Sequence, residues 1–158
     1  MNSKNKEFLR RAIQLSEEKM MENHGGPFGA VIVKDNRIIA EGYNQVTSNN
    51  DPTAHAEIIA IRTACEALND FHLEGAKIYC SCEPCPMCLS AIYWARIEKI
   101  YYANTCKDAK EAGFDDENFY TELTKNGVQR KIPAIQLLAN EGKAALMEWV
   151  KKEDKIPY

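Results

Sequence analysis

The sequence lacks an apolar run of the roughly 18 residues that a membrane-spanning helix needs, so we expect no membrane insertion. It also lacks a basic excess, because 20 Lys and Arg against 23 Asp and Glu give a formal net charge of −3. Such a charge provides no general attraction for a phosphate backbone, which argues against nucleic acid as a partner. The first residues show no apolar segment followed by a small-residue cleavage site, so a cytoplasmic location is expected.

Histidine is scarce, with three residues, whereas four of the six cysteines fall in the run CSCEPCPMC at 80–88. In a reducing cytoplasm, clustered cysteines more often bind metal or take part in chemistry than form structural disulfides. The run therefore directs attention to a metal or redox site.

The 158 residues are expected to form a single domain, 1–158, because the length suits one core and no linker or repeat interrupts it. Strand and helix patterns alternate around a short hairpin. This order predicts an α/β fold of three α/β/α layers with a mixed, about five-stranded sheet. Helices are expected at 5–23, from Asp51 to 68, at 85–97 and at 142–152, and strands at 29–34, 37–41, 76–82, 99–104 and 128–138.

The cysteine run alone fits several kinds of site. An iron–sulfur motif fails because its fourth cysteine position is occupied by Ile92. A structural zinc site with all four cysteines in nine residues would strain the backbone around a tetrahedral ion. A redox pair formed by Cys85 and Cys88 at a helix start stays open as an alternative.

A catalytic zinc site explains the run together with the distant tripeptide His55-Ala56-Glu57. Such a site has three protein ligands and an open position. Cys85 and Cys88 are spaced i and i+3 on one helix face, and His55 completes the set. Glu57 is then free to carry protons between water and substrate. The joint pattern of His-x-Glu and Pro-Cys-x-x-Cys is the signature of zinc nucleobase deaminases.

Four stretches resemble the small bacterial guanine deaminases of the cytidine deaminase superfamily, and the resemblance covers nearly the whole chain. The zinc motifs fit any member, whereas AGFDD and the long tail favour guanine. The resemblance implies a hydrolase that acts on a cyclic amidine C–N bond, with one Zn²⁺ per subunit and with xanthine and ammonia as products. The stretches are GGPFGAVIVKD (25–35), SNNDPTAHAE (48–57), SCEPCPMCLSAIYWARI (81–97) and AGFDD (112–116).

The resemblance also implies contacts with a purine. Guanine has acceptor atoms on one edge and N–H donors on the other, so its pocket needs a donor and an acidic acceptor. Asn44 is expected to supply the amide, and Asp116, or else Asp115, the acceptor that carries a proton to the leaving ammonia. The expected aromatic and tail contacts are Phe28, Trp94 and Tyr158.

Members that this chain resembles form dimers, so we expect a homodimer whose C-terminal segment is exchanged between subunits. Other substrates stay open: a tRNA adenosine deaminase shares the zinc site, and guanosine, cytosine or a related amino-heterocycle needs only a different pocket. A zinc-binding structural module would have no use for Glu57.

Overall fold

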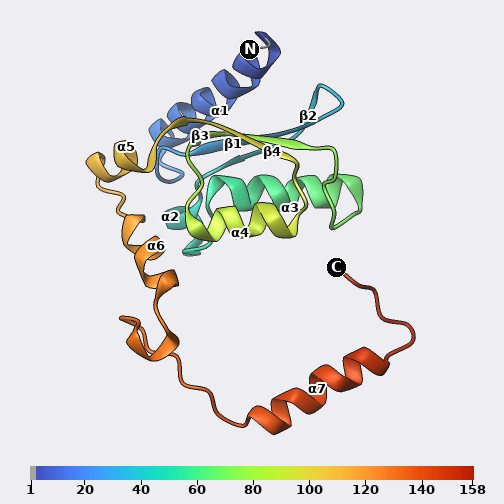
Figure 1. Cartoon of the computed structure of the whole chain (residues 1–158). Coiled ribbons are helices and arrows are strands. Elements are labelled where there is room, and N and C mark those ends of the chain that lie inside the picture. The colour runs from blue at the N-terminus through green and yellow to red at the C-terminus, as the bar shows by residue number, and fades with distance from the viewer. Residues whose placement is uncertain (1–2) are drawn as a thin grey trace. The chain divides into compact units, whose positions relative to one another are not determined.

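The computed structural model describes residues 3–158, which divide into two compact units after Glu117. The first unit holds a sheet with helices on both faces (Figure 1). Its strands are β1 (Gly29–Lys34), β2 (Arg37–Tyr43), β3 (Lys77–Cys82) and β4 (Lys99–Asn104). Its helices are α1 (Ser3–Met21), α2 (Val46–Asn49), α3 (Ala56–Leu68), α4 (Pro86–Trp94) and α5 (Cys106–Glu111).

The sheet has the strand order β2-β1-β3-β4 and is mixed, as predicted. Strand β1 pairs antiparallel with both β2 and β3, whereas β3 and β4 run parallel. Asp35 and Asn36 join β1 to β2 with φ angles of 51° and 58°. Two successive positive φ angles are typical of the tight hairpin turn that matches the strand twist. The predicted hairpin is therefore confirmed.

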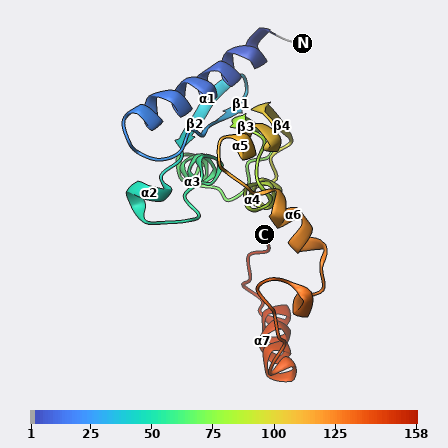
Figure 2. The same ribbon diagram turned by 90° about the vertical axis from the view of Figure 1, so that its left-hand side faces the viewer.

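Strand β1 is buried on both sides, which places it at the centre of the three layers. Ala30 and Ile32 face the core beneath α3 and α4, and Val31 and Val33 face the core beneath α1. Because successive side chains of a strand point to opposite faces, one short run supplies both cores. The view along the sheet shows α1 on one side and α3 with α4 on the other (Figure 2).

Helix α3 packs unusually close to β2. A Cβ atom on Gly42 would lie 2.2 Å from the carbonyl oxygen of Ala56 and 2.5 Å from the backbone nitrogen of Ala60. Only glycine allows this approach, which brings the first turn of α3 directly against the sheet. This close approach fixes the positions of His55 and Glu57 relative to the sheet.

The prediction that α3 starts at Asp51 is wrong, since its first residue is Ala56. The Asp51 carboxylate accepts hydrogen bonds from the backbone N–H and the hydroxyl of Thr53, at 2.8 Å and 2.7 Å. This local turn competes with the helix, as Asp side chains commonly do. The result leaves His55 at the N-cap of α3.

The fold class is confirmed, but four strands form among residues 3–158, and the strand predicted at 128–138 does not. In the second unit, the backbone N–H of Ala134 donates to the Gly127 carbonyl at 3.0 Å, and that of Lys131 donates to the Glu122 carboxylate at 2.7 Å. These donors close a loop, and Pro133 has no N–H to offer a sheet. The second unit instead contains the end of α6 (Glu117–Thr124), η1 (Gly127–Gln129) and α7 (Ala139–Lys151).

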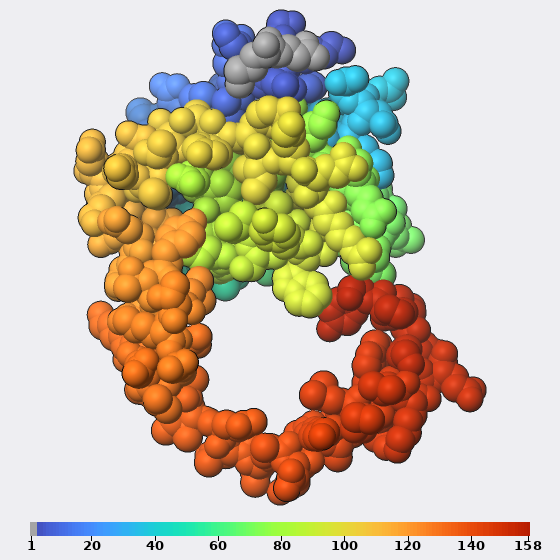
Figure 3. Space-filling model, viewed as in Figure 1, coloured from blue at the N-terminus to red at the C-terminus, as the bar shows by residue number. Residues whose placement is uncertain are grey.

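The edge strand β4 and the residues 105–117 that follow it lie on the surface of the first unit (Figure 3). Across residues 3–158, none of the helices has both the length and the apolar character needed to cross a membrane.

Candidate metal centre and active site

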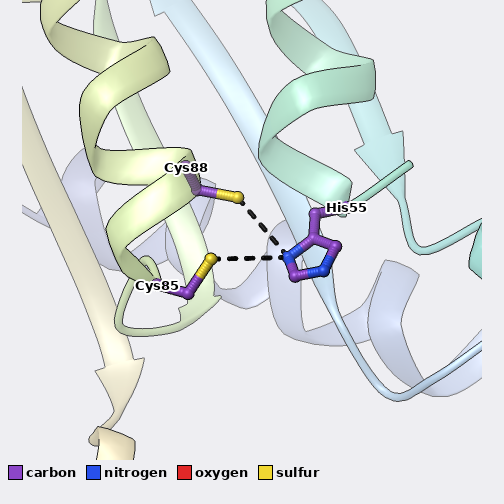
Figure 4. Close-up of side chains that lie close together, drawn as sticks. All are labelled: His55, Cys85 and Cys88. Carbon is purple, nitrogen blue, oxygen red and sulfur yellow. Dashed lines mark hydrogen bonds between the residues drawn. The ribbon is translucent and has the colours of Figure 1, made fainter. Parts of the chain in front are cut away.

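His55 is the last residue before α3 and has an extended backbone, with φ −71° and ψ 156°. An N-cap side chain often bonds back to its own helix. The imidazole of His55 makes no such bond, so it turns toward α4 instead (Figure 4).

Cys85 occupies the same position on α4 that His55 occupies on α3. It is the N-cap, with φ −64° and ψ 168°, and Pro86 follows as the first helical residue. Proline suits that place because its missing N–H would have no partner in the first turn. Cys88 then lies in the first turn, and both sulfur atoms face His55 (Figure 4).

The three donor atoms have the spacing of a zinc site. Nδ1 of His55 lies 3.6 Å from Sγ of Cys85 and 3.5 Å from Sγ of Cys88, and all three atoms fall within 4.8 Å of one another. Tetrahedral zinc at about 2.3 Å from sulfur and about 2.0–2.1 Å from nitrogen would hold such donors about 3.5–3.6 Å apart. One imidazole and two thiolates also balance the charge of Zn²⁺. The residues therefore fit the ion.

The protons of this cluster are distributed unequally. Hydrogen bonds from Cys88 and His55 lower the pKa of the Cys85 thiol to about 4, although burial opposes the shift. The hydrogen bond to Cys85 raises the pKa of His55, and the same neighbour together with burial raises that of Cys88. A divalent cation bound to these three donors would displace the protons that they hold.

Glu57 lies in the first turn of α3 and is buried, with 7% of its surface exposed. Burial raises the pKa of its carboxyl to about 7, and the nearby charge of Cys85 adds to the shift. A bound cation would lower this pKa, because positive charge favours the carboxylate. Glu57 is outside the donor set of His55, Cys85 and Cys88, so its carboxyl is available to exchange protons near neutral pH.

Asp116 is the last residue of the segment between α5 and α6, and its burial differs from that of its neighbour Asp115. Its Oδ1 atom is buried and has no hydrogen-bond partner in the described part of the chain, whereas Asp115 is exposed. Burial, and then the charge of Cys85, raises the pKa of the Asp116 carboxyl. The charge of Asp116 in turn contributes to the raised pKa of His55. Asp116 therefore lies within electrostatic range of the metal centre and has an unused acceptor.

Asn44 follows β2 and is buried, with 7% of its surface exposed. Its Oδ1 atom accepts hydrogen bonds from the backbone N–H groups of Gly26 and Val46, at 3.1 Å and 3.3 Å. Two donors on one atom identify it as the carbonyl oxygen of the amide. Asn44 can therefore offer a ligand only its Nδ2 donor.

Phe28 is half-buried and packs edge-to-face against Phe114, with ring centroids 4.8 Å apart. Sequence reasoning did not single out Phe114, although the bulky residue after Gly113 was a usable signal. Gly113 has a φ of 93°, and the backbone N–H of Phe114 closes α5 by donating to Ala109 at 2.9 Å. Glu83 was also missed, because nothing in its spacing predicts that its carboxylate accepts from the N–H of Cys106 at 3.1 Å.

The two remaining residues are exposed in the single chain. Trp94 is the last residue of α4 and is 67% exposed, at the end of the helix remote from Cys85. Tyr158 belongs to the second unit and is 73% exposed. Their contacts with a substrate stay predictions.

A family model described as "Cytidine and deoxycytidylate deaminase zinc-binding region" matches residues 2–104 of the chain. The matched region contains the three zinc donors, Glu57 and Asn44, and it ends at Asn104, the last residue of β4. Phe114 and Asp116 come after the matched region.

Individual proteins extend the similarity over the rest of the chain. Guanine deaminase of Bacillus subtilis is 51% identical over 151 residues, covering 96% of this chain and 97% of that protein. The X-ray structure of guanine deaminase from Bacillus subtilis superposes with a TM-score of 0.95 at 50% identity, covering 100% of this chain and 99% of that chain. A tRNA-specific adenosine deaminase of Aquifex aeolicus is 40% identical over 108 residues, covering 68% of this chain and 70% of that protein.

Proposed function

Because the chain belongs to the cytidine and deoxycytidylate deaminase family, we propose that it hydrolyses the exocyclic C–N bond of guanine, giving xanthine and ammonia. The observation that carries the hydrolytic chemistry is the triad of His55, Cys85 and Cys88 beside the buried carboxyl of Glu57. The choice of guanine rests on the 51% identity with the Bacillus subtilis enzyme.

His55, Cys85 and Cys88 would hold one zinc ion per subunit, with His55 bound through Nδ1. Zinc with three protein ligands lowers the pKa of water, which allows hydrolysis near neutral pH. Glu57 takes one proton from water and delivers it to a ring nitrogen. It then carries the second proton, from the hydroxyl added to the base, to the departing amine. Its burial suits this work because a raised pKa lets one carboxyl act as base and as acid in the same cycle.

Two further polar side chains suit the two edges of guanine. Asn44, whose oxygen is already bonded twice, donates from Nδ2 to the acceptors O6 or N7. Asp116, whose Oδ1 finds no partner among residues 3–158, accepts from the N–H groups of the base and relays toward ammonia the second proton that Glu57 collects. Asp115 is the less suitable acceptor because it is exposed.

Phe28 provides an aromatic wall for the purine. Its ring is held edge-on by Phe114 at 4.8 Å, an arrangement that stabilises aromatic pairs by about 0.5–1.5 kcal/mol and limits the motion of the Phe28 ring. A planar base can then stack on the fixed ring, as bases stack on aromatic side chains elsewhere.

We also propose that the functional protein is a homodimer in which the segment 118–158 completes the site of the partner. Trp94 and Tyr158 would provide further contacts with the substrate. This segment exposes many large apolar side chains in the single chain, and α7 buries none of its residues. Exposed apolar surface of that extent is typical of an interface. Six free cysteines suit a cytoplasmic location, where thiols stay reduced.

The test is to load the purified protein with zinc and incubate it with guanine, guanosine, adenine, cytosine and cytidine. Ammonia release and the absorbance of xanthine should appear with guanine and should stop on addition of a chelator. Ammonia from another substrate but not from guanine would reassign the pocket. Inosine formed in a tRNA stem-loop without any turnover of guanine would favour the tRNA adenosine deaminase instead.

A further inference from the structure

Glu83 joins two parts of the site that are far apart in sequence. Its backbone N–H donates to the Asn104 carbonyl at 2.8 Å, which extends the pairing of β3 with β4 by one residue. Its carboxylate reaches further and accepts from the N–H of Cys106, the first residue of α5, at 3.1 Å. Two residues after Glu83 stands Cys85, a zinc donor.

Several hydrogen bonds hold the start of α5 in place. Thr105 and Asp108 form a reciprocal capping box, in which the Thr105 N–H donates to the Asp108 carboxylate at 2.7 Å. The capping box leaves the N–H of Cys106 unsatisfied, and Glu83 accepts from it. A carboxylate is well suited to this place because the first turn of a helix carries partial positive charge.

The far end of α5 leads directly to the proposed substrate contacts. Phe114 closes the helix through its bond to Ala109 and rests on Phe28. Among residues 3–158, the Oδ1 atom of Asp116 finds no hydrogen-bond partner. The place of this acceptor is therefore set by the backbone that α5 anchors.

We infer that Glu83 is a positioning residue that fixes Asp116 relative to Cys85 by clamping the first residue of α5 to the end of β3. The inference rests on the proposed function, in which Asp116 accepts from guanine. In this account the effect of Glu83 on the substrate passes through the α5 segment. The metal-binding turn and the acidic acceptor consequently share one anchor.

Two substitutions separate the clamp from a general effect on folding. Glu83→Ala removes the acceptor, whereas Glu83→Gln keeps a carbonyl oxygen that can accept from Cys106. We expect Glu83→Ala to keep its zinc and to lose about 10- to 100-fold in kcat/KM for guanine, and Glu83→Gln to stay within a few-fold of wild type. Glu74→Ala is the matched control, since Glu74 pairs with Arg96 at the surface, at 3.3 Å.

A double-mutant cycle with Asp116→Asn tests the route of the effect. If Glu83 acts through Asp116, Glu83→Ala should cost less than about 3-fold more once Asp116 has been replaced. An equal loss in both backgrounds, a loss of zinc, or an unchanged kcat/KM in Glu83→Ala would overturn the inference.

Hydrogen exchange provides a readout that needs no turnover. In the zinc-loaded protein without substrate, Glu83→Ala should speed amide exchange across 105–116 by at least about 10-fold and leave α3 and β1 unchanged. Unchanged exchange in that segment would show that Glu83 does not anchor it. If the wild-type protein released no ammonia from guanine, the proposed function would fall, and the exchange rates would still decide whether the clamp exists.

Discussion

Gly25 lies so close to Asn44 that a Cβ atom at position 25 would come within 2.3 Å of the Asn44 carbonyl oxygen and 2.5 Å of its Oδ1. The close approach lets the N–H of Gly26 donate to that same Oδ1. The glycine pair therefore fixes the direction in which Asn44 presents its Nδ2 donor.

Gly25→Ala should displace Asn44 and weaken guanine binding. We expect KM to rise and kcat/KM to fall about 10- to 100-fold, because a side-chain donor moved by 1 Å loses its hydrogen bond to the base. Zinc content should not change. Steady-state kinetics and metal analysis measure both effects.

Gly142→Ala is the matched control for this substitution. Position 142 lies within α7, and a Cβ atom there would meet nothing within 4 Å. In the single chain the added methyl group has no close contact, so zinc content should not change and the helix should gain about 0.5–1 kcal/mol. Wild-type kinetics in Gly25→Ala would show that Asn44 does not depend on its glycine neighbour.

Cys85→Ala should remove zinc and activity together. The variant keeps two of three donors, and we expect less than a tenth of the wild-type zinc content and a loss of at least about 1,000-fold in kcat. Cys65→Ala is the control, because Cys65 lies on α3 outside the donor set. Full zinc occupancy in Cys85→Ala would mean that the ion is held elsewhere.

Glu57→Gln should separate zinc binding from turnover. The amide cannot shuttle protons, so kcat should fall about 100- to 10,000-fold while zinc content stays at one per subunit. Glu57→Ala should likewise keep the metal and lose nearly all turnover. Substantial activity in either variant would exclude Glu57 as the proton carrier.

In the metal-free protein, the same Glu57→Gln substitution should raise the free energy of unfolding at high pH. Burial raises the pKa of Glu57 from 4.5 to about 7, so the folded state binds a proton that the unfolded state has released. The resulting stability is complete below about pH 4.5 and is lost as pH rises through 7, a difference of about 3 kcal/mol. Glu57→Gln should remove this loss and be the more stable protein at pH 8. Urea denaturation of both chelator-treated proteins at pH 5 and pH 8 measures the free energy of unfolding. An equal change between the two pH values in wild type and in Glu57→Gln would contradict the prediction.

Mixing inactive subunits tests whether Tyr158 acts in the partner. Glu57→Ala and Tyr158→Ala homodimers should each be weakly active. After subunit exchange, one site of each heterodimer pairs an intact Glu57 with an intact Tyr158 only if the segment 118–158 crosses between subunits. We then expect recovery toward about a quarter of wild-type activity, since half of the dimers carry one complete site. No recovery in exchanged dimers would place Tyr158 in its own subunit's site.

The sequence predicted the zinc donors because their chemistry demands few residue types at fixed spacing. His55 and the pair Cys85 and Cys88 could be matched without knowing the helix boundaries. The boundary itself was missed because Asp51 and Pro52 resemble a helix start, and only the bonds from Thr53 show that Asp51 begins a turn instead.

Long-range packing explains the other differences between the expectations from the sequence and the structure. The segment 128–138 has the alternating apolar residues of a strand, but its donors Lys131 and Ala134 are used within the second unit. The roles of Phe114 and Glu83 depend on partners far away in sequence, Phe28 and Cys106, which no local pattern reveals.

Asn104 is both the last residue of β4 and the last residue that the family model matches. The zinc donors and Glu57 all come before it. Phe114 and Asp116, to which we assign contacts with the base, come after it. Substitutions beyond β4 therefore offer a way to alter the choice of base without replacing a zinc donor or the proposed proton carrier.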